Sequence, residues 1–202
     1  MPEREGTGPS ATNIHIHLPR HFMLIGLTGR NASGKSTLVE WFSARGMESV
    51  SCSDSIRKWL SEQGIEATRE ELIKGGRELR REGGPGVLAE MLLESIDGED
   101  AIVDSIRTPA EVEALRSRGD FVLIEVTADV EVRWGRMVER GRFGDAKEKA
   151  TFLAQEEEES ESEDDAGQAL NATAMLADMI VVNDGSKEDL EEILGEIWEG
   201  LT

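Results

Sequence analysis

One segment of the sequence has the residue types and the spacing that bind phosphate groups. Residues 29–36 fit the pattern G-x-x-x-x-G-K-[ST], in which glycines let consecutive backbone N–H groups turn toward phosphate oxygens. Lys35 can bridge the β- and γ-phosphates of a nucleoside triphosphate, and the Ser36 hydroxyl can complete the coordination of Mg²⁺. The segment therefore predicts binding of ATP with Mg²⁺. The predicted contact residues are Gly29, Arg30, Asn31, Ala32, Ser33, Gly34, Lys35, Ser36 and Thr37.

A strand and a helix must flank such a loop, and the sequence supplies both. The apolar, uncharged run of residues 22–27 predicts a buried central strand, and the pattern of residues 37–45 predicts a helix that begins near Lys35. The N-terminus of this helix adds unsatisfied N–H groups and the positive end of the helix dipole to the site. A glycine-rich turn without a ligand is the weaker interpretation, because strand, loop and helix coincide with every fixed residue of the pattern.

Apolar strand-like runs and helical patterns alternate along the rest of the chain. This alternation predicts an α/β fold of three layers, with a parallel sheet of about five strands and helices on both faces. Residues 21–202 are expected to form this domain, and the polar, aperiodic residues 1–20 are expected to be a disordered leader. The further strands are predicted at residues 47–51, 101–104, 121–126 and 179–182.

The charge of the chain limits its partners. It has 42 acidic and 22 basic residues and a formal net charge of −20. Nucleic acids and anionic membranes bind to basic surfaces, so both are disfavoured as partners. No apolar run approaches the length of a membrane-spanning helix, about 18 residues, and no secretory signal is recognisable. The single cysteine, Cys52, suits a reducing interior, so we expect a cytoplasmic protein that acts on a small molecule.

An aspartate and an arginine are expected close to the phosphate loop. The strand at residues 101–104 ends in Asp104, which at the carboxyl edge of a parallel sheet can hold Mg²⁺ or a water bound to it. A capping role at the end of the strand is the alternative. Arg107 follows three residues later and is expected to face the same crevice.

A second arginine stands where a helix disfavours positive charge. Arg57 lies in the first turns of a helix predicted at residues 55–63, just after Asp54. The positive end of the helix dipole repels a cation at this position, so Arg57 indicates a bound anion, with a solvated helix face as the alternative.

Arginines accumulate along a helix predicted at residues 129–140, and an acidic run follows it. Crowded guanidinium groups are costly unless an anion lies among them, and bidentate contact with phosphate is what arginine provides. The acidic run at residues 156–165 repels itself, so we expect it to be a solvated segment against which no phosphate can bind. The arginines in question are Arg133, Arg136, Arg140 and Arg142.

Beyond these patterns, the chain resembles the nucleoside monophosphate kinase group of P-loop kinases, and within it the archaeal adenylate-kinase-related and dephospho-CoA-kinase-like proteins. Besides the phosphate loop, residues 53–57 (SDSIR) and 103–107 (VDSIR) carry the resemblance, the latter being similar to a D-G-x-x-R segment. The resemblance implies that Arg57 and Arg107 bind the phosphate of the acceptor and that Asp104 binds the metal ion. Ser105 departs from the pattern, since these kinases usually have glycine there.

The resemblance also implies roles for the second half of the chain. Arg136 and Arg140 are similar to arginines that clamp the transferred phosphoryl group. The turn at residues 183–186, including Asp184 and Gly185, is similar to the turn whose backbone lies against the adenine of ATP. An acceptor-binding insertion is expected at about residues 53–97 and a lid at about residues 141–168, although the acidic run stands where further lid arginines are expected.

Together these features predict a nucleotide kinase that transfers the γ-phosphoryl group of Mg·ATP to a nucleoside monophosphate or a similar phosphorylated nucleotide. The catalytic residues would be Lys35, Arg107, Arg136 and Arg140. Two alternatives stay open. A hydroxyl kinase similar to dephospho-CoA kinase would need a base, for which Asp54 is the candidate. A regulatory protein that binds ATP or AMP with little turnover is favoured by the acidic lid.

Overall fold

The structure is a computed structural model that describes residues 23–96, 100–141, 145–160 and 169–201. Its five strands form one parallel sheet in the order β2-β3-β1-β4-β5, which confirms the expected α/β fold. The expected leader at residues 1–20 lies outside the described residues. The strands are β1 Leu24–Thr28, β2 Glu48–Ser51, β3 Ala101–Asp104, β4 Phe121–Thr127 and β5 Met179–Val182.

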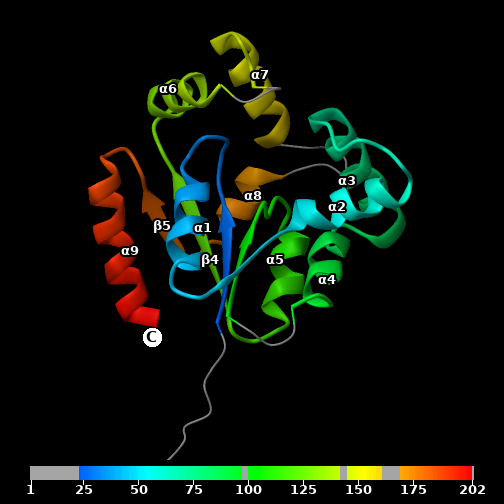
Figure 1. Ribbon diagram of the computed structural model, residues 1–202, viewed down its shortest axis with the longest axis horizontal. Coiled ribbons are helices and arrows are strands. Elements are labelled where there is room, and N and C mark those ends of the chain that lie inside the picture. The colour runs from blue at the N-terminus through cyan, green and yellow to red at the C-terminus, as the bar shows by residue number, and fades with distance from the viewer. Residues whose placement is uncertain (1–22, 97–99, 142–144, 161–168, 202) are drawn as a thin grey trace, which may run out of the picture.

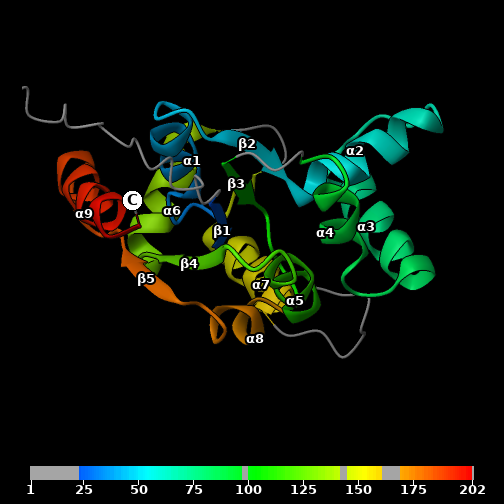
Figure 2. The same cartoon turned by 90° about the horizontal axis from the view of Figure 1, so that it is seen from below.

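The sheet separates two layers of helices (Figures 1 and 2). In Figure 2, α1 and α9 lie on one face, and α5 and α8 lie on the other. In both views α2, α3 and α4 extend beyond the β2 end of the sheet, while α9 lies at the β5 end. The helices are α1 Lys35–Ser43, α2 Cys52–Glu62, α3 Arg69–Gly83, α4 Val87–Leu93, α5 Pro109–Arg116, α6 Val130–Arg140, α7 Lys149–Ser160, α8 Leu170–Ala174 and α9 Lys187–Leu201.

The central strand β1 is buried along its whole length, as its uncharged sequence predicts. Successive side chains point to opposite faces, so β1 contributes to two hydrophobic cores. Leu24 packs with residues of α2, α4 and α5, whereas Ile25 and Leu27 pack with residues of α1 and α9. Because all strands are parallel, the loops after β1, β2, β3 and β5 emerge at the same edge of the sheet.

Helix α2 begins three residues earlier than the sequence indicates, at Cys52 instead of Ser55. Ser51 caps it, because the Ser51 hydroxyl accepts a hydrogen bond from the Ser53 N–H at 3.3 Å. Asp54 therefore lies in the first helical turn, where its negative charge interacts favourably with the positive end of the helix dipole. The next helical segment is divided at residues 84–86, between α3 and α4.

The expectation of a solvated acidic segment is wrong for Glu156 and Ser160, which are buried, whereas Glu157 and Glu158 are exposed. Residues 156–160 belong to helix α7, in which Phe152, Glu156 and Ser160 are buried. Phe152 packs against Trp134 of α6, with ring centroids 5.7 Å apart. Arginines from other elements neutralise the buried glutamates, which a count of acidic residues along the sequence does not reveal. Residues 161–165 of the run lie outside the described residues, as does Arg142.

A buried ion pair joins α3 to α5 and supports the turn after β3. The guanidinium group of Arg80 donates two hydrogen bonds to Glu111 Oε1, at 2.7 and 3.2 Å, and both side chains are buried. Glu111 Oε2 accepts hydrogen bonds from the N–H groups of Arg107 and Thr108, at 2.7 and 3.2 Å. The carboxylate thus fixes the backbone of Arg107.

None of the described helices combines the length and the hydropathy that a membrane span requires.

Candidate functional site

The phosphate loop joins β1 to α1, and its two pattern glycines are required by close contacts. Gly29 has φ 132° and Gly34 has φ 106°, both in the region that favours glycine. A Cβ atom would lie 2.2 Å from the Val126 carbonyl oxygen at Gly29, and 2.1 Å from the Asn183 side-chain nitrogen at Gly34. Any side chain at these positions would displace the loop from its neighbours.

Lys35 lies at the centre of a group of charged side chains. Its Nζ atom donates hydrogen bonds to the carbonyl oxygens of Gly29 and Arg30, at 2.7 and 2.9 Å. Burial lowers the pKa of the Lys35 amine to about 8, and the nearby Asp104 carboxylate opposes part of this shift. The other charged groups that act on it are Arg107, Glu159 and Arg133. The amine is thus mostly charged at neutral pH and loses its charge in mild base.

Asp104 offers an oxygen that a metal ion could use. It ends β3, which pairs with β1 through Gly26 and Val103, so Asp104 lies beside the phosphate loop. Its Oδ1 atom is buried and has no hydrogen-bond partner among the described residues. A buried carboxylate oxygen without a donor is costly unless a ligand satisfies it, and Mg²⁺ prefers such oxygens. Asp104, together with the exposed Ser36 hydroxyl, therefore fits a magnesium site.

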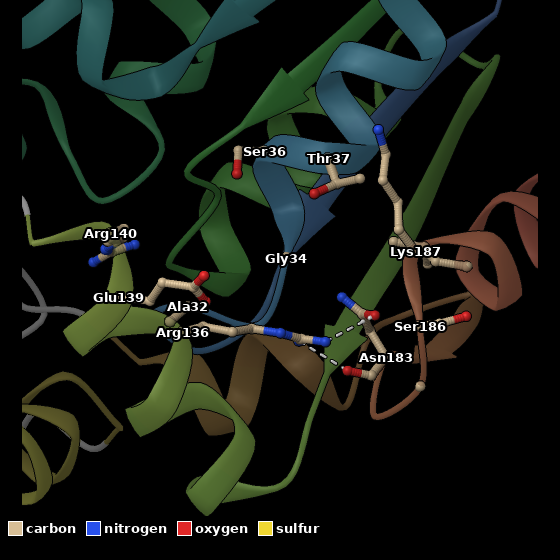
Figure 3. Close-up of a pocket in the computed structure, with 12 residues that line it drawn as sticks. Ala32, Gly34, Ser36, Thr37, Arg136, Glu139, Arg140, Asn183, Ser186 and Lys187 are labelled. Atoms are coloured by element: carbon tan, nitrogen blue, oxygen red, sulfur yellow. Dashed lines mark hydrogen bonds between the residues drawn. The ribbon is translucent and has the colours of Figure 1, made fainter.

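A cavity of about 510 Å³ adjoins the phosphate loop on the side of β5 (Figure 3). The loop and the start of α1 form one wall, α6 forms another, and the turn from β5 to α9 forms the third. This volume lies within the range of small-molecule sites, roughly 300–1,000 Å³. Five predicted contact residues line it: Ala32, Gly34, Ser36, Thr37 and Gly185. Arg136 and Arg140, predicted as catalytic, line it as well.

Asn183 connects three walls of this cavity, although the sequence did not single it out. Its side-chain nitrogen donates a hydrogen bond to the Ser33 carbonyl oxygen at 2.8 Å. Arg136 donates to the Asn183 backbone and side-chain oxygens, at 2.9 and 3.3 Å, as Figure 3 shows. Asn183 is only 5% exposed. Its position directly after the last apolar strand, at the carboxyl edge of the sheet, is the signal that could have identified it.

The two neighbouring residues of the same turn differ in their placement. Gly185, for which contact with the nucleotide was predicted, lines the cavity. Asp184 is exposed, and its Oδ1 atom accepts a hydrogen bond from the Asp129 N–H at 2.6 Å. Asp184 therefore supports the start of α6 and is absent from the cavity lining.

Arg140 reaches the phosphate loop from the end of α6. It donates hydrogen bonds to Asn31 Oδ1 at 3.0 Å and to Asp145 at 2.8 and 2.9 Å. Arg136 and Arg140, which were expected to clamp the transferred phosphoryl group, thus lie one turn apart on α6 and contact Asn183 and Asn31 respectively.

The predicted acceptor residues are divided between two places. Arg107 belongs to the group around Lys35, and its guanidinium lies 3.3 Å from Glu159 of α7. Arg57 lies on the outer side of α2, half exposed, and contacts Asp54 at 3.0 Å and the Ser53 hydroxyl at 2.6 Å. Neither Arg57 nor Asp54 is among the charged groups that act on Lys35.

Besides Asn183, two charged residues of the site, Arg133 and Glu156, were not among the predicted site residues. Arg133 is buried beneath the loop, where it donates to the Ala128 carbonyl oxygen at 2.9 Å and to Glu156. Glu156 also lies 3.7 Å from the guanidinium of Arg30. Arg133 shares a helical face with Arg136 and Arg140, which is a usable signal, whereas nothing in the acidic run distinguishes Glu156.

Known proteins with similar sequences identify the family of this chain. The sequence profile described as an AAA domain matches residues 25–164. A UPF0200 protein of Thermococcus onnurineus is 31% identical over 187 residues, which span 89% of this chain and 98% of that protein. The chain belongs to the UPF0200 family. Another member, from Methanocaldococcus jannaschii, is 32% identical over 188 residues, covering 89% of this chain and 92% of that protein.

Several solved structures similar to this UPF0200 protein are named as small-molecule kinases. A shikimate kinase from Bacteroides thetaiotaomicron superposes with a TM-score of 0.59 at 17% identity, covering 89% of this chain and 98% of that chain. A shikimate kinase from Acinetobacter baumannii, in complex with shikimate, gives 0.57 at 14% identity, with coverage of 89% and 94%. At these identities the likeness shows the fold alone, which is that of a P-loop kinase. Nucleotide binding is implied by the match to the AAA-domain profile.

Proposed function

We propose that this UPF0200 protein is a kinase that transfers the γ-phosphoryl group of Mg·ATP to a small acceptor that already carries a phosphate, such as a nucleoside monophosphate. The observation that carries the proposal is the position of Lys35 between two different regions. The cavity lies on the β5 side of the phosphate loop, and the Asp104 and Arg107 pair lies on the β3 side. A donor and an acceptor could therefore approach the loop from opposite sides.

On the donor side, the residues divide the work of holding ATP. The cavity between the loop, α6 and the turn at Gly185 has room for the base and the ribose. The loop N–H groups and Lys35 would hold the phosphates, with Arg136 and Arg140 close to the loop. Ser36 and Asp104 would hold Mg²⁺, which neutralises charge on the phosphates when it is bound. Positioning and charge neutralisation are what phosphoryl transfer requires of a protein.

On the acceptor side, Arg107 is the residue best placed to bind a phosphate. Its backbone is fixed by Glu111, and its guanidinium lies near Lys35. Arg57 would contribute a second contact at the start of the insertion at about residues 53–97. A phosphate oxygen attacks without prior removal of a proton, so this acceptor needs no general base.

A hydroxyl kinase, such as one acting on dephospho-CoA, is a second candidate. Its support is the similarity of the fold to proteins named shikimate kinase and gluconokinase, the latter with a TM-score of 0.50. Asp54 would then have to accept the proton of the hydroxyl. Its ion pair with Arg57 and its distance from the group around Lys35 weigh against this role.

Phosphorus NMR of the purified protein with Mg·ATP tests the proposal. Candidate acceptors are AMP, CMP, UMP, GMP, their deoxy forms and dephospho-CoA. A new diphosphate signal with one monophosphate supports the proposal and identifies the acceptor, whereas a new phosphomonoester from dephospho-CoA supports the hydroxyl kinase. Unchanged spectra with every acceptor, despite thermal protection by ATP, contradict both and favour a regulatory protein that binds ATP or AMP.

A further inference from the structure

Arginines from four different elements meet the glutamates of α7. Glu156 contacts Arg133 of α6 and lies 3.7 Å from Arg30 of the phosphate loop. Glu159 lies 3.3 Å from Arg107, in the turn after β3, and Glu158 lies 3.4 Å from Arg77 of α3. The last turns of α7 thus lie over the phosphate loop in the described structure, as Figure 1 also shows.

These ion pairs differ in how far they are shielded from solvent, and the shielded pairs contribute more to holding α7 in place. Arg77 and Glu158 are 43% and 72% exposed, and exposed pairs of this kind contribute little. Glu156 and its partner Arg133 are both 6% exposed, and Glu159 and Arg107 are 16% and 25% exposed. The two shielded glutamates therefore hold the arginines nearest to Lys35, while Glu158 sits at the rim.

A carboxylate that pairs with an arginine occupies the guanidinium edge to which a phosphate would bind. Both groups present oxygens that accept the parallel N–H bonds of a guanidinium, and one guanidinium edge cannot serve both at once. Arg30 belongs to the phosphate-binding pattern and Arg107 faces Lys35. An anion that binds to the loop and extends toward these arginines must therefore either replace Glu156 and Glu159 or lie beside two negative charges.

We propose that α7 is a built-in competitor of phosphate ligands, in which Glu156 and Glu159 stand in for phosphate groups until a polyphosphate ligand displaces them. The nature of the natural ligand rests on the proposed function, but the competition requires only that phosphates bind to the loop. The apparent affinity for the phosphate ligand is then the intrinsic affinity multiplied by the fraction of molecules in which α7 has left these arginines. This competition favours ligands with several phosphates, because a ligand with one carboxylate binds to the arginine no better than the glutamate that it replaces.

Glu159→Gln and Glu157→Gln are a matched pair of variants for testing this competition. Each removes one acidic charge from α7, at positions two residues apart. Glu157 is exposed and forms no ion pair with any described residue, whereas Glu159 holds Arg107. Glu159 is preferable to Glu156, because removing the partner of the buried Arg133 could unfold this region.

The first measurement is the affinity for inorganic tripolyphosphate with Mg²⁺, by isothermal titration calorimetry. Glu159→Gln should bind about tenfold more tightly than the wild type, and Glu157→Gln should bind like the wild type. Equal or weaker binding by Glu159→Gln overturns the competition. Absence of tripolyphosphate binding in all three proteins would overturn the proposed kinase as well, whereas binding without the difference overturns the competition alone.

Hydrogen exchange provides the second measurement, on the unmodified protein. Saturating tripolyphosphate should accelerate amide exchange in residues 149–160, because the ligand removes the contacts that hold the helix. Unchanged or slower exchange would mean that α7 stays docked or closes over the ligand, which contradicts the proposal. Neither measurement depends on phosphoryl transfer, so a protein without kinase activity can still satisfy both.

Discussion

The side chain of Asn183 donates a hydrogen bond to the carbonyl oxygen of Ser33, 2.8 Å away and 150 residues earlier in the chain. This contact joins the turn after β5 to the phosphate loop. Arg136 of α6 binds to the same asparagine, so one buried amide holds three walls of the cavity in register. The shape of the cavity therefore depends on the side chain of Asn183.

Replacing Asn183 should weaken both the fold and nucleotide binding. Asn183→Ala leaves the Ser33 carbonyl without its donor and removes the side-chain acceptor of Arg136, although the backbone acceptor remains. These losses should lower the free energy of unfolding by about 1–3 kcal/mol. Urea denaturation measures this loss, and the Kd for ATP should rise in the same variant. Gln63→Ala, at an exposed position, serves as the control. An Asn183→Ala protein as stable as this control would refute the linking role.

Lys35 makes nucleotide binding sensitive to pH in mild base. Burial lowers the pKa of the free amine to about 8, whereas bound phosphates favour its charged form. Binding then takes up a proton above pH 8, so the affinity for ATP should fall by about tenfold between pH 7 and pH 9. Calorimetric titrations at several pH values measure this. Lys35→Ala should bind weakly and without this slope, and an equal slope in that variant would exclude Lys35 as the titrating group.

Removing the charge of Glu111 should strongly lower the free energy of unfolding, because this carboxylate supports the turn after β3 that contains Arg107. Its carboxylate is fully buried and serves Arg80 and the N–H groups of Arg107 and Thr108. Glu111→Gln leaves the buried Arg80 without a counter-charge, at a cost of about 3–5 kcal/mol. The free energy of unfolding in urea is the readout. Glu113→Gln, exposed on the same helix, should change it little, and similar values for both variants would contradict the structure.

The local parts of this architecture could be predicted from the sequence because local signals specify them. The uncharged run before Gly29 specifies β1, and the glycine and lysine spacing specifies the loop. The pairing of Arg80 with Glu111, 31 residues apart, has no such signal. Likewise Glu156 looks solvated within its acidic run, and only the approach of Arg133 from another helix explains its burial. Long-range charge pairing was therefore the part that sequence patterns could not supply.

Ser105 shows a departure from the expected pattern that has a structural cost. Its φ of 65° lies in the left-handed region, which disfavours every residue with a Cβ atom, and the resembling kinases usually have glycine there. Ser105→Gly should therefore raise the free energy of unfolding by about 0.5–1 kcal/mol. Ser117→Gly, at a residue with φ −60°, should lower it or leave it unchanged. Destabilisation by Ser105→Gly would mean that the serine side chain contributes more than its backbone strain costs.

The central claim is that Lys35 and its loop transfer a phosphoryl group. The most direct test measures transfer of the radioactive phosphoryl group from γ-³²P-ATP to an acceptor. The purified protein, Lys35→Ala and the exposed control Lys58→Ala are each incubated with Mg²⁺ and the acceptor panel. The account predicts labelled acceptor with the wild type and with Lys58→Ala, and a loss of at least about a hundredfold in rate with Lys35→Ala. Equal rates in all three proteins, or no labelled acceptor with the wild type, would contradict it.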